Sequence, residues 1–196
     1  MVRVGITGGM GSGKSVVAEL LQVMNIPVYN ADDASKKILK NDDRIRRKLQ
    51  NLLGDDIFFS DGELNRGQMA SLIFNNPELL SQTNAIIHPA VFDDFEYWCR
   101  LQSSNVVACE SAIIFECGLN RRLDHVIMVS APEEIRIARA AARDHTDKEQ
   151  IISRVKNQMP DNEKAQLADF IVINDDRQAL IPQIRSLGIV LFFGNQ

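Results

Sequence analysis

A glycine-rich segment near the start of the chain has the residue types and spacing of a phosphate-binding loop. Residues 8–15 read Gly-Gly-Met-Gly-Ser-Gly-Lys-Ser, which fits the pattern G-x-x-x-x-G-K-[ST]. Glycines let successive backbone N–H groups converge on phosphate oxygens, and the N-terminus of a following helix adds its positive dipole. Lys14 is expected to reach the β- and γ-phosphates, and the Ser15 hydroxyl to ligate Mg²⁺. The predicted nucleotide-binding residues are Gly8, Gly11, Ser12, Gly13, Lys14, Ser15 and Val16, the last through its backbone N–H.

The nucleotide is predicted to be ATP or GTP. No Asn-Lys-x-Asp segment, which GTPases use to read guanine, occurs in the chain, and there is no second nucleotide loop. These observations favour a small ATP-dependent kinase.

A kinase with a hydroxyl acceptor also needs a carboxylate that takes the proton of the nucleophile. Asn30-Ala31-Asp32-Asp33 follows the second predicted strand, at the end of the sheet where such a base belongs. The residues alone leave two alternatives open. Asp32 or Asp33 is the base, or one of them simply caps a helix that begins near Ala34.

Two further acids end or follow apolar runs. Glu116 comes after Ile113-Ile114-Phe115, and Glu110 comes after residues 106–109. Either carboxylate can support Mg²⁺ through a water molecule. The alternative for both is a surface carboxylate without a ligand.

Three arginines mark a possible cover over the nucleotide. Arg136, Arg139 and Arg143 are spaced i, i+3 and i+7, so a helix places them on one face, where they repel unless an anion compensates. Residues 136–156 carry a net charge of +3, whereas the whole chain has a formal charge of −4. This reversal is consistent with a lid that closes over ATP phosphates. The alternative is a solvated helix face.

The elements that position these residues alternate between short apolar strands and amphipathic helices. Helical patterns separate the strand-like runs, so the expected class is α/β with a parallel sheet. Between residues 34 and 103 the alternation gives way to helices, with two of them expected around Pro77 and Pro89. The strand-like runs are residues 2–7, 26–29, 106–109, 125–129, 170–173 and 189–193.

Composition excludes several classes of protein. The 196 residues are 45% hydrophobic and 24% charged, as in ordinary folded chains. The negative net charge argues against a basic surface that binds nucleic acid. Three cysteines without a Cys-x-x-Cys pair fit a reducing compartment. No apolar run approaches the length of a membrane span, and strand and loop occupy the first residues where a secretion signal would lie. We therefore expect a cytoplasmic protein.

Taken together, these motifs resemble the dephospho-coenzyme A kinase family over nearly the whole chain. Residues 5–15 resemble its glycine loop with a Thr-Gly-Gly lead-in, and Asn30-Ala31-Asp32 stands where the family has Asp-Ala-Asp. Asn30 and Val16 depart from the family pattern. The other matching segments are Leu64-Asn65-Arg66 with Phe74, His88-Pro89, Ile113-Ile114-Phe115-Glu116, Arg139, Arg143-Asp144, Gln158, and Ala168-Asp169 through Asn174.

The resemblance implies transfer of the ATP γ-phosphate to the ribose 3′-hydroxyl of dephospho-CoA, the last step of CoA biosynthesis. It implies a P-loop NTPase fold of the nucleoside and nucleotide kinase type, with three layers and a five-stranded parallel sheet. The core is expected at about 1–33, 104–132 and 160–196, the helical acceptor-binding region at about 34–103 and the lid at about 133–159. A monomer or weak homo-oligomer is expected.

The resemblance also assigns roles to residues. It selects Asp32 over Asp33 as the base, and the implied roles fall into three sets. The catalytic set is Asp32, Lys14 and Arg139, nucleotide binding adds Arg143 and Asn174, and acceptor binding uses Asp32, Arg66, His88 and Glu116.

Overall fold

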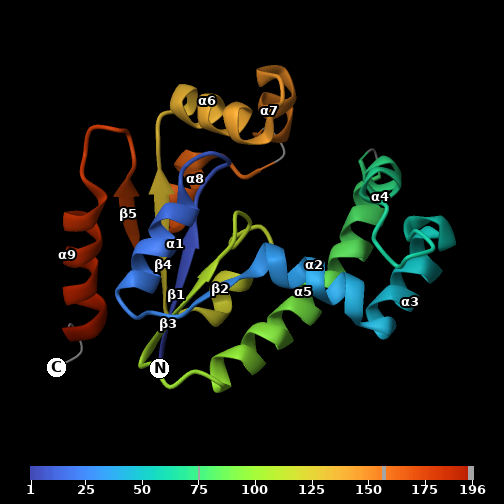
Figure 1. The fold of residues 1–196 in the computed structure, drawn as a ribbon, viewed down its shortest axis with the longest axis horizontal. Coiled ribbons are helices and arrows are strands. Elements are labelled where there is room, and N and C mark those ends of the chain that lie inside the picture. The colour runs from blue at the N-terminus through green and yellow to red at the C-terminus, as the bar shows by residue number, and fades with distance from the viewer. Residues whose placement is uncertain (75, 156–157, 194–196) are drawn as a thin grey trace. The chain divides into compact units, whose positions relative to one another are not determined.

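Parallel strands form the centre of the first of two structural units (Figure 1). The computed structural model describes residues 1–74, 76–155 and 158–193, and within these ranges five strands pair in the order β2-β3-β1-β4-β5. The expected five-stranded parallel sheet of an α/β protein is confirmed. The strands are β1 (Val2–Thr7), β2 (Val28–Asn30), β3 (Val106–Glu110), β4 (His125–Ser130) and β5 (Phe170–Ile173).

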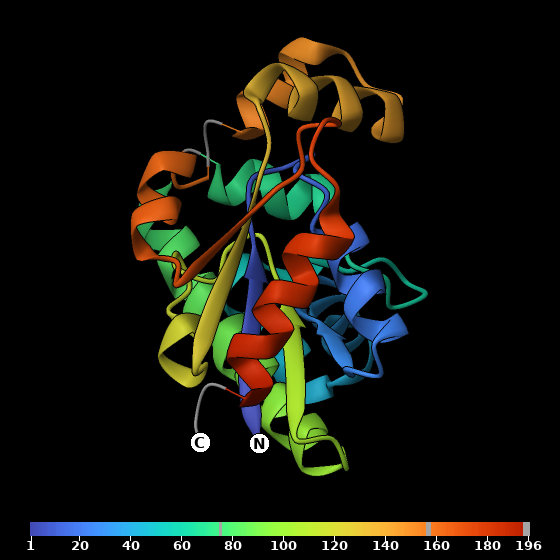
Figure 2. The same ribbon diagram turned by 90° about the vertical axis from the view of Figure 1, so that its left-hand side faces the viewer.

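This first unit spans Met1–Asn30 and Gln102–Gln196. Figure 2 shows α9 crossing one face of the sheet, the face on which α1 also packs. Its helices are α1 (Lys14–Val23), the 3₁₀ helix η2 (Leu119–Arg122), α6 (Glu133–Asp144), α7 (Lys148–Val155), α8 (Asp161–Leu167) and α9 (Leu180–Phe193).

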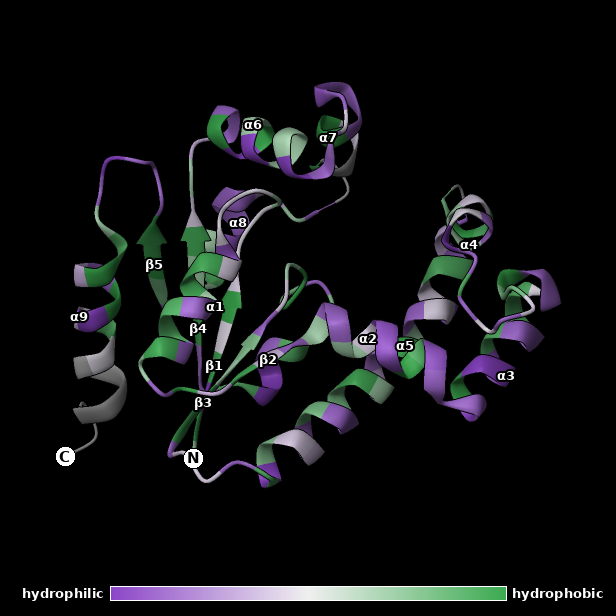
Figure 3. Ribbon diagram, in the orientation of Figure 1, coloured by the Kyte–Doolittle hydropathy of each residue, from purple (hydrophilic) through white to green (hydrophobic). Residues whose placement is uncertain are grey.

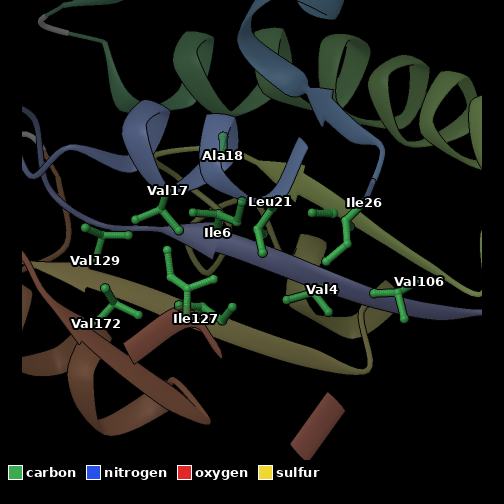
Figure 4. Close-up of a cluster of buried hydrophobic side chains, with 12 residues drawn as sticks. Val4, Ile6, Val17, Ala18, Leu21, Ile26, Val106, Ile127, Val129 and Val172 are labelled. Carbon is green, nitrogen blue, oxygen red and sulfur yellow. The ribbon is translucent and has the colours of Figure 1, made fainter. Parts of the chain in front are cut away.

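Apolar side chains of the sheet and of α1 form the main core (Figure 4). Val4 and Ile6 of β1 alternate with Gly5, so the two apolar residues point to the α1 face. Val17 and Leu21 of α1 are spaced one helical turn apart and pack against them. Figure 3 shows the matching pattern, with apolar colouring along β4 and β5. This packing fixes the end of β1 and the start of α1.

The second unit, Ala31–Leu101, is helical. Its own apolar core contains Leu39, Ile45, Leu49, Ile57 and Phe58. Its elements are α2 (Ala31–Asn41), α3 (Asp43–Leu53), the 3₁₀ helix η1 (Asp55–Ile57), α4 (Arg66–Ile73) and α5 (Pro77–Arg100).

One expected strand is a helix. Residues 189–193 were predicted to extend along the sheet, but they belong to α9. Leu180, Ile184 and Leu187 recur every three to four residues and pack against the core of the sheet. Because these contacts already fix a helix, the apolar run that follows continues it.

The expectation of two helices around Pro77 and Pro89 is also wrong. A single helix, α5, runs from Pro77 to Arg100 with Pro89 inside it. Buried side chains lie on both sides of the proline, Thr83 before it and Phe95 after it. Packing of both halves offsets the backbone hydrogen bond that proline cannot donate.

No helix among the described residues is long and apolar enough to cross a membrane.

Candidate functional site

The glycine-rich segment forms a loop between β1 and α1. Gly13 is the residue before α1 and has a φ of 90°, a left-handed conformation that favours glycine. A Cβ at this position would lie 2.1 Å from Nδ2 of Asn174, so glycine is required for space as well. Buried strand, tight loop and helix N-terminus together make the anion-binding arrangement that the motif predicts.

Lys14 folds back over the loop. Its Nζ donates hydrogen bonds to the carbonyl oxygens of Gly8 (3.0 Å) and Gly9 (3.3 Å). The ammonium is thus held beside the backbone that would surround a phosphate.

Ser15 and Val16 lie in the first turn of α1, and both are exposed. The backbone N–H of Val16 donates to the carbonyl oxygen of Gly13 at 3.1 Å. The Val16 N–H was predicted to bind phosphate, and in this structure it donates to the backbone at the start of α1 instead.

Asn174, distant in sequence, lies against the loop. Its Nδ2 donates to the carbonyl oxygen of Ser12 at 2.8 Å, and its backbone N–H donates to Ser130 of β4. Arg139 of α6 donates from Nη1 to the carbonyl oxygen of Asn174 at 3.1 Å and pairs with Asp176. The structure thus brings the predicted residues Ser12, Asn174 and Arg139 together.

The three arginines of α6 do not form a uniform stripe. Arg136 is buried, Arg139 is partly exposed, and Arg143 is mostly exposed and pairs with Asp144 at 2.7 Å. The hydrogen bond to Asp144 raises the pKa of the Arg143 guanidinium above its usual value. Of the three arginines, Arg143 is the most exposed to solvent.

Glu110 lies at the loop end of the sheet. In the strand register it is level with Ile6 of β1 and with Asn30 of β2. Nδ2 of Asn30 donates to Oε2 of Glu110 at 3.1 Å. Of the two acids considered for Mg²⁺, Glu110 is therefore the one beside the strand that leads into the loop.

The partners of Glu116 in the structure indicate a role in stability. Its Oε1 lies 2.8 Å from Nζ of Lys164 and accepts the backbone N–H of Met159 at 3.0 Å. Lys164 is fully buried and also donates to the carbonyl oxygen of Ala112 at 2.6 Å. The acceptor-binding role of Glu116 stays a prediction.

Asp32 and Asp33 lie inside the first turn of α2, which begins at Ala31 rather than near Ala34. Neither is the residue that precedes the helix, so the capping alternative is wrong for this helix start. Asp33 pairs with Lys36 at 2.6 Å. Asp32 is exposed, and the structure gives its carboxylate no partner among the described residues.

The other predicted acceptor residues also belong to the second unit. Arg66 is the exposed first residue of α4, which Asn65 caps by accepting the N–H of Gln68. His88 of α5 is half-buried and stacks on Phe92. Burial lowers the pKa of His88 below its usual value of 6.5. The imidazole is therefore neutral at pH 7.

Known proteins match the chain over nearly its whole length. The sequence model of the family described as dephospho-CoA kinase matches residues 2–179. The dephospho-CoA kinase of Bacteroides fragilis is 44% identical over 97% of this chain and 93% of its own. That of Porphyromonas gingivalis is 42% identical over 94% and 91%. This chain belongs to the dephospho-CoA kinase family.

Solved structures share the fold of this chain. A crystal structure of a Thermus thermophilus protein has a TM-score of 0.84 and 32% identity, and covers 97% of this chain and 96% of its own. Shikimate kinase from Bacteroides thetaiotaomicron, with a TM-score of 0.56 and 13% identity over 97% and 98%, shares the fold alone. The expected P-loop kinase fold is confirmed.

One departure from the dephospho-CoA kinase pattern has a structural explanation. An aspartate at position 30 would bring a second carboxylate to Glu110, and the two charges would repel. Asn30 instead donates a hydrogen bond to that carboxylate.

Sequence reasoning about this family member missed the buried partners of the loop and of α6. The spacing of Arg136 predicted its face on the helix but not its burial, and no signal in the sequence pointed to Lys164 or Asp161. Burial of a charged residue depends on which distant acid lies nearby, and spacing does not report that.

Proposed function

We propose that this protein transfers the γ-phosphoryl group of ATP to the ribose 3′-hydroxyl of dephospho-CoA, giving CoA and ADP. The observation that carries the proposal is the loop of residues 8–15, in which Lys14 folds back onto the backbone and which Asn174 contacts. The loop lies in a chain of the dephospho-CoA kinase family. The loop supplies binding of nucleotide phosphates, and family membership supplies the acceptor.

In the proposed reaction the chain mainly positions and stabilises charge. Lys14 exchanges its bonds to the carbonyl oxygens of Gly8 and Gly9 for contacts with the β- and γ-phosphates. Arg139 and Arg143 balance negative charge on the transferring group. The acceptor oxygen bonds to the γ-phosphorus as the bond to the β–γ bridging oxygen breaks, and the hydroxyl proton passes to Asp32.

Mg²⁺ fits the donor atoms of the loop region. Among residues 1–74, 76–155 and 158–193, no cluster of three or more His, Cys, Asp or Glu side chains is arranged to hold a metal ion. An exposed Ser15 hydroxyl, with Glu110 acting through water, offers the hard oxygen ligands that Mg²⁺ accepts alongside nucleotide phosphates. When bound, the ion neutralises charge on the β- and γ-phosphates.

The acceptor is proposed to bind through Asp32, Arg66 and His88 of the second unit and through Glu116 of the first. Arg66 is a permanent cation suited to a phosphate of dephospho-CoA. Neutral His88 can donate or accept a hydrogen bond without adding charge. We further propose a cytoplasmic monomer or weak homo-oligomer without a nucleic-acid partner, in keeping with its net charge of −4.

The experiment compares Asp32→Asn with Asp33→Asn in a coupled assay of ADP release. Asp32→Asn should bind ATP normally and lose about 10² to 10⁴-fold in turnover with dephospho-CoA, because it removes the proton acceptor. Asp33→Asn, which removes the charge of an exposed carboxylate paired with Lys36, should stay near wild type.

Two results would contradict the proposal. Near-normal turnover of Asp32→Asn would show that Asp32 is not the base. Equal ADP release with shikimate, a nucleoside or no acceptor would remove dephospho-CoA as the substrate.

A further inference from the structure

Arg136 is a buried cation on the lid helix α6. The residue is 4% exposed, and its Nε lies 3.4 Å from Oδ2 of Asp161 at the start of α8. Glu133, one turn earlier, is 4.0 Å from Nη2. Burying a charge this fully is costly unless close partners compensate. The position of Arg136 therefore needs an explanation beyond a solvated helix face.

The same residue touches the phosphate-binding loop at two points. A Cβ on Gly9 would lie 2.0 Å from Nη1 of Arg136 and 2.8 Å from Oδ1 of Asp161. A Cβ on Gly11 would lie 2.1 Å from the carbonyl oxygen of Arg136. Side chains at these two positions would push α6 and the loop apart. The absence of both side chains lets the lid helix lie directly on the loop.

The loop region also holds every buried side-chain polar atom that lacks a hydrogen-bond partner in the described part of the chain. These atoms are Nε and Nη1 of Arg136 and the hydroxyl oxygens of Thr7 and Ser12. Nε of Arg136 keeps its ion pair with Asp161, but native proteins rarely leave buried polar atoms without a hydrogen bond. Their concentration at one loop marks a region built for something other than stability alone.

A second contact holds the loop from the segment that returns from the lid. Oε1 of Gln158 accepts the backbone N–H of Met10 at 3.1 Å. Asp161, three residues later, is the ion partner of Arg136. Residues 9–11 are thus held between α6 and residues 158–161.

We propose that Arg136 is a positioning residue for nucleotide binding and phosphoryl transfer. Its guanidinium and carbonyl hold Gly9 and Gly11 in place, and its ion pair with Asp161 joins the loop to both ends of the lid. The residue acts through the loop backbone without touching ATP. This inference rests on the proposed phosphoryl transfer, but its effect on ATP binding can be measured without an acceptor.

The test is a set of substitutions at Arg136, measured first as affinity for a non-hydrolysable ATP analogue by calorimetry. Arg136→Gln removes the charge and the planar group, and should weaken binding about 10- to 100-fold because the loop is misplaced. Arg136→Lys keeps the cation beside Asp161 and should recover part of the loss. The matched control is Arg121→Gln on η2, which is exposed and should bind as wild type.

Kinetics then separate positioning from general damage. The KM for ATP should rise in Arg136→Gln while the KM for dephospho-CoA stays within about twofold, because the ion pairs of Arg136 are with Glu133 and Asp161 and not with a proposed acceptor contact. A general loss of structure would change both constants and give no recovery with lysine. Equal rises in both constants, or an unchanged analogue affinity, would overturn the proposal.

Gly9→Ala provides the second variant. In the wild-type background the new methyl group meets the Arg136 guanidinium, so analogue binding should weaken about 10-fold or more. In the Arg136→Gln background the same change should cost much less, because the obstacle is smaller. Should Arg136→Gln not fold, Gly9→Ala alone decides, and unchanged affinity would overturn the proposal. Analogue binding that follows these expectations without ADP release from dephospho-CoA would refute only the proposed function.

Discussion

Glu116→Gln should destabilise the protein through Lys164. The Lys164 ammonium is fully buried, 2.8 Å from Oε1 of Glu116 and 2.6 Å from the carbonyl oxygen of Ala112. Removing the carboxylate charge leaves a buried cation with neutral acceptors. Breaking a buried pair in this way costs about 3 to 5 kcal/mol. Because the Glu116 side chain is 24% exposed and water can replace part of it, the lower figure of about 3 kcal/mol applies.

The assay is thermal unfolding at pH 7 followed by circular dichroism. For a chain of this size, a loss of about 3 kcal/mol lowers the midpoint by about 6 to 12 °C. Glu163→Gln is the control, since Glu163 is an exposed neighbour on α8 and its loss should change little. The double variant Glu116→Leu with Lys164→Met should recover most of the stability, because an apolar pair leaves no charge unpaired.

The same variants test the predicted acceptor role of Glu116. If the residue acts only through Lys164, the KM for dephospho-CoA measured well below the midpoint stays unchanged. A midpoint within about 2 °C of wild type would refute the destabilisation argued from burial. A raised KM at full stability would instead place Glu116 among the acceptor contacts.

Two further predictions concern the loop and the helical unit. Gly13→Ala should abolish ATP binding in calorimetry and lower the stability of the protein by about 1 to 3 kcal/mol. The reason is that φ of Gly13 is 90° and that the new Cβ would lie 2.1 Å from Asn174. ATP binding as tight as that of wild type would contradict this. The lowered pKa of His88 means that folding favours its neutral form, so this part of stability is complete above the usual value of 6.5 and is lost as pH falls through the lowered folded value. Urea midpoints between pH 7.5 and 5.0 should therefore fall more in wild type than in His88→Gln, and equal slopes would refute the effect.

The parts of the fold that sequence predicts best are those that local chemistry determines. The loop of residues 8–15 needs only glycines and a lysine in order, and the buried strands need only short apolar runs. The run at 189–193 was misassigned because apolar residues alone do not distinguish a strand from a buried helix segment. Pro89 was misread because tertiary packing on both sides of a proline can outweigh its local cost.

Site residues from distant parts of the chain were harder to predict. Asn174 is 162 residues from Ser12, and the residues between them do not reveal that contact. Family resemblance supplied Asn174, as the last residue of the matching segment that begins at Ala168-Asp169. The resemblance did not supply Lys164 or Asp161 as partners. Those contacts depend on where α8 lies after α7, and only the structure shows the position of α8.

The arginines of α6 show how one spacing gives three different environments. The side chains of Arg136, Arg139 and Arg143 are 5%, 28% and 64% exposed, so exposure rises along the helix from Arg136 to Arg143. Repulsion along the face is reduced because each cation has its own acid: Asp161, Asp176 and Asp144. An incoming phosphate can reach an exposed guanidinium at small cost, but not one that is buried beside the loop. Of these three cations, the outer two are therefore suited to meet the nucleotide and the innermost to hold the loop that binds it.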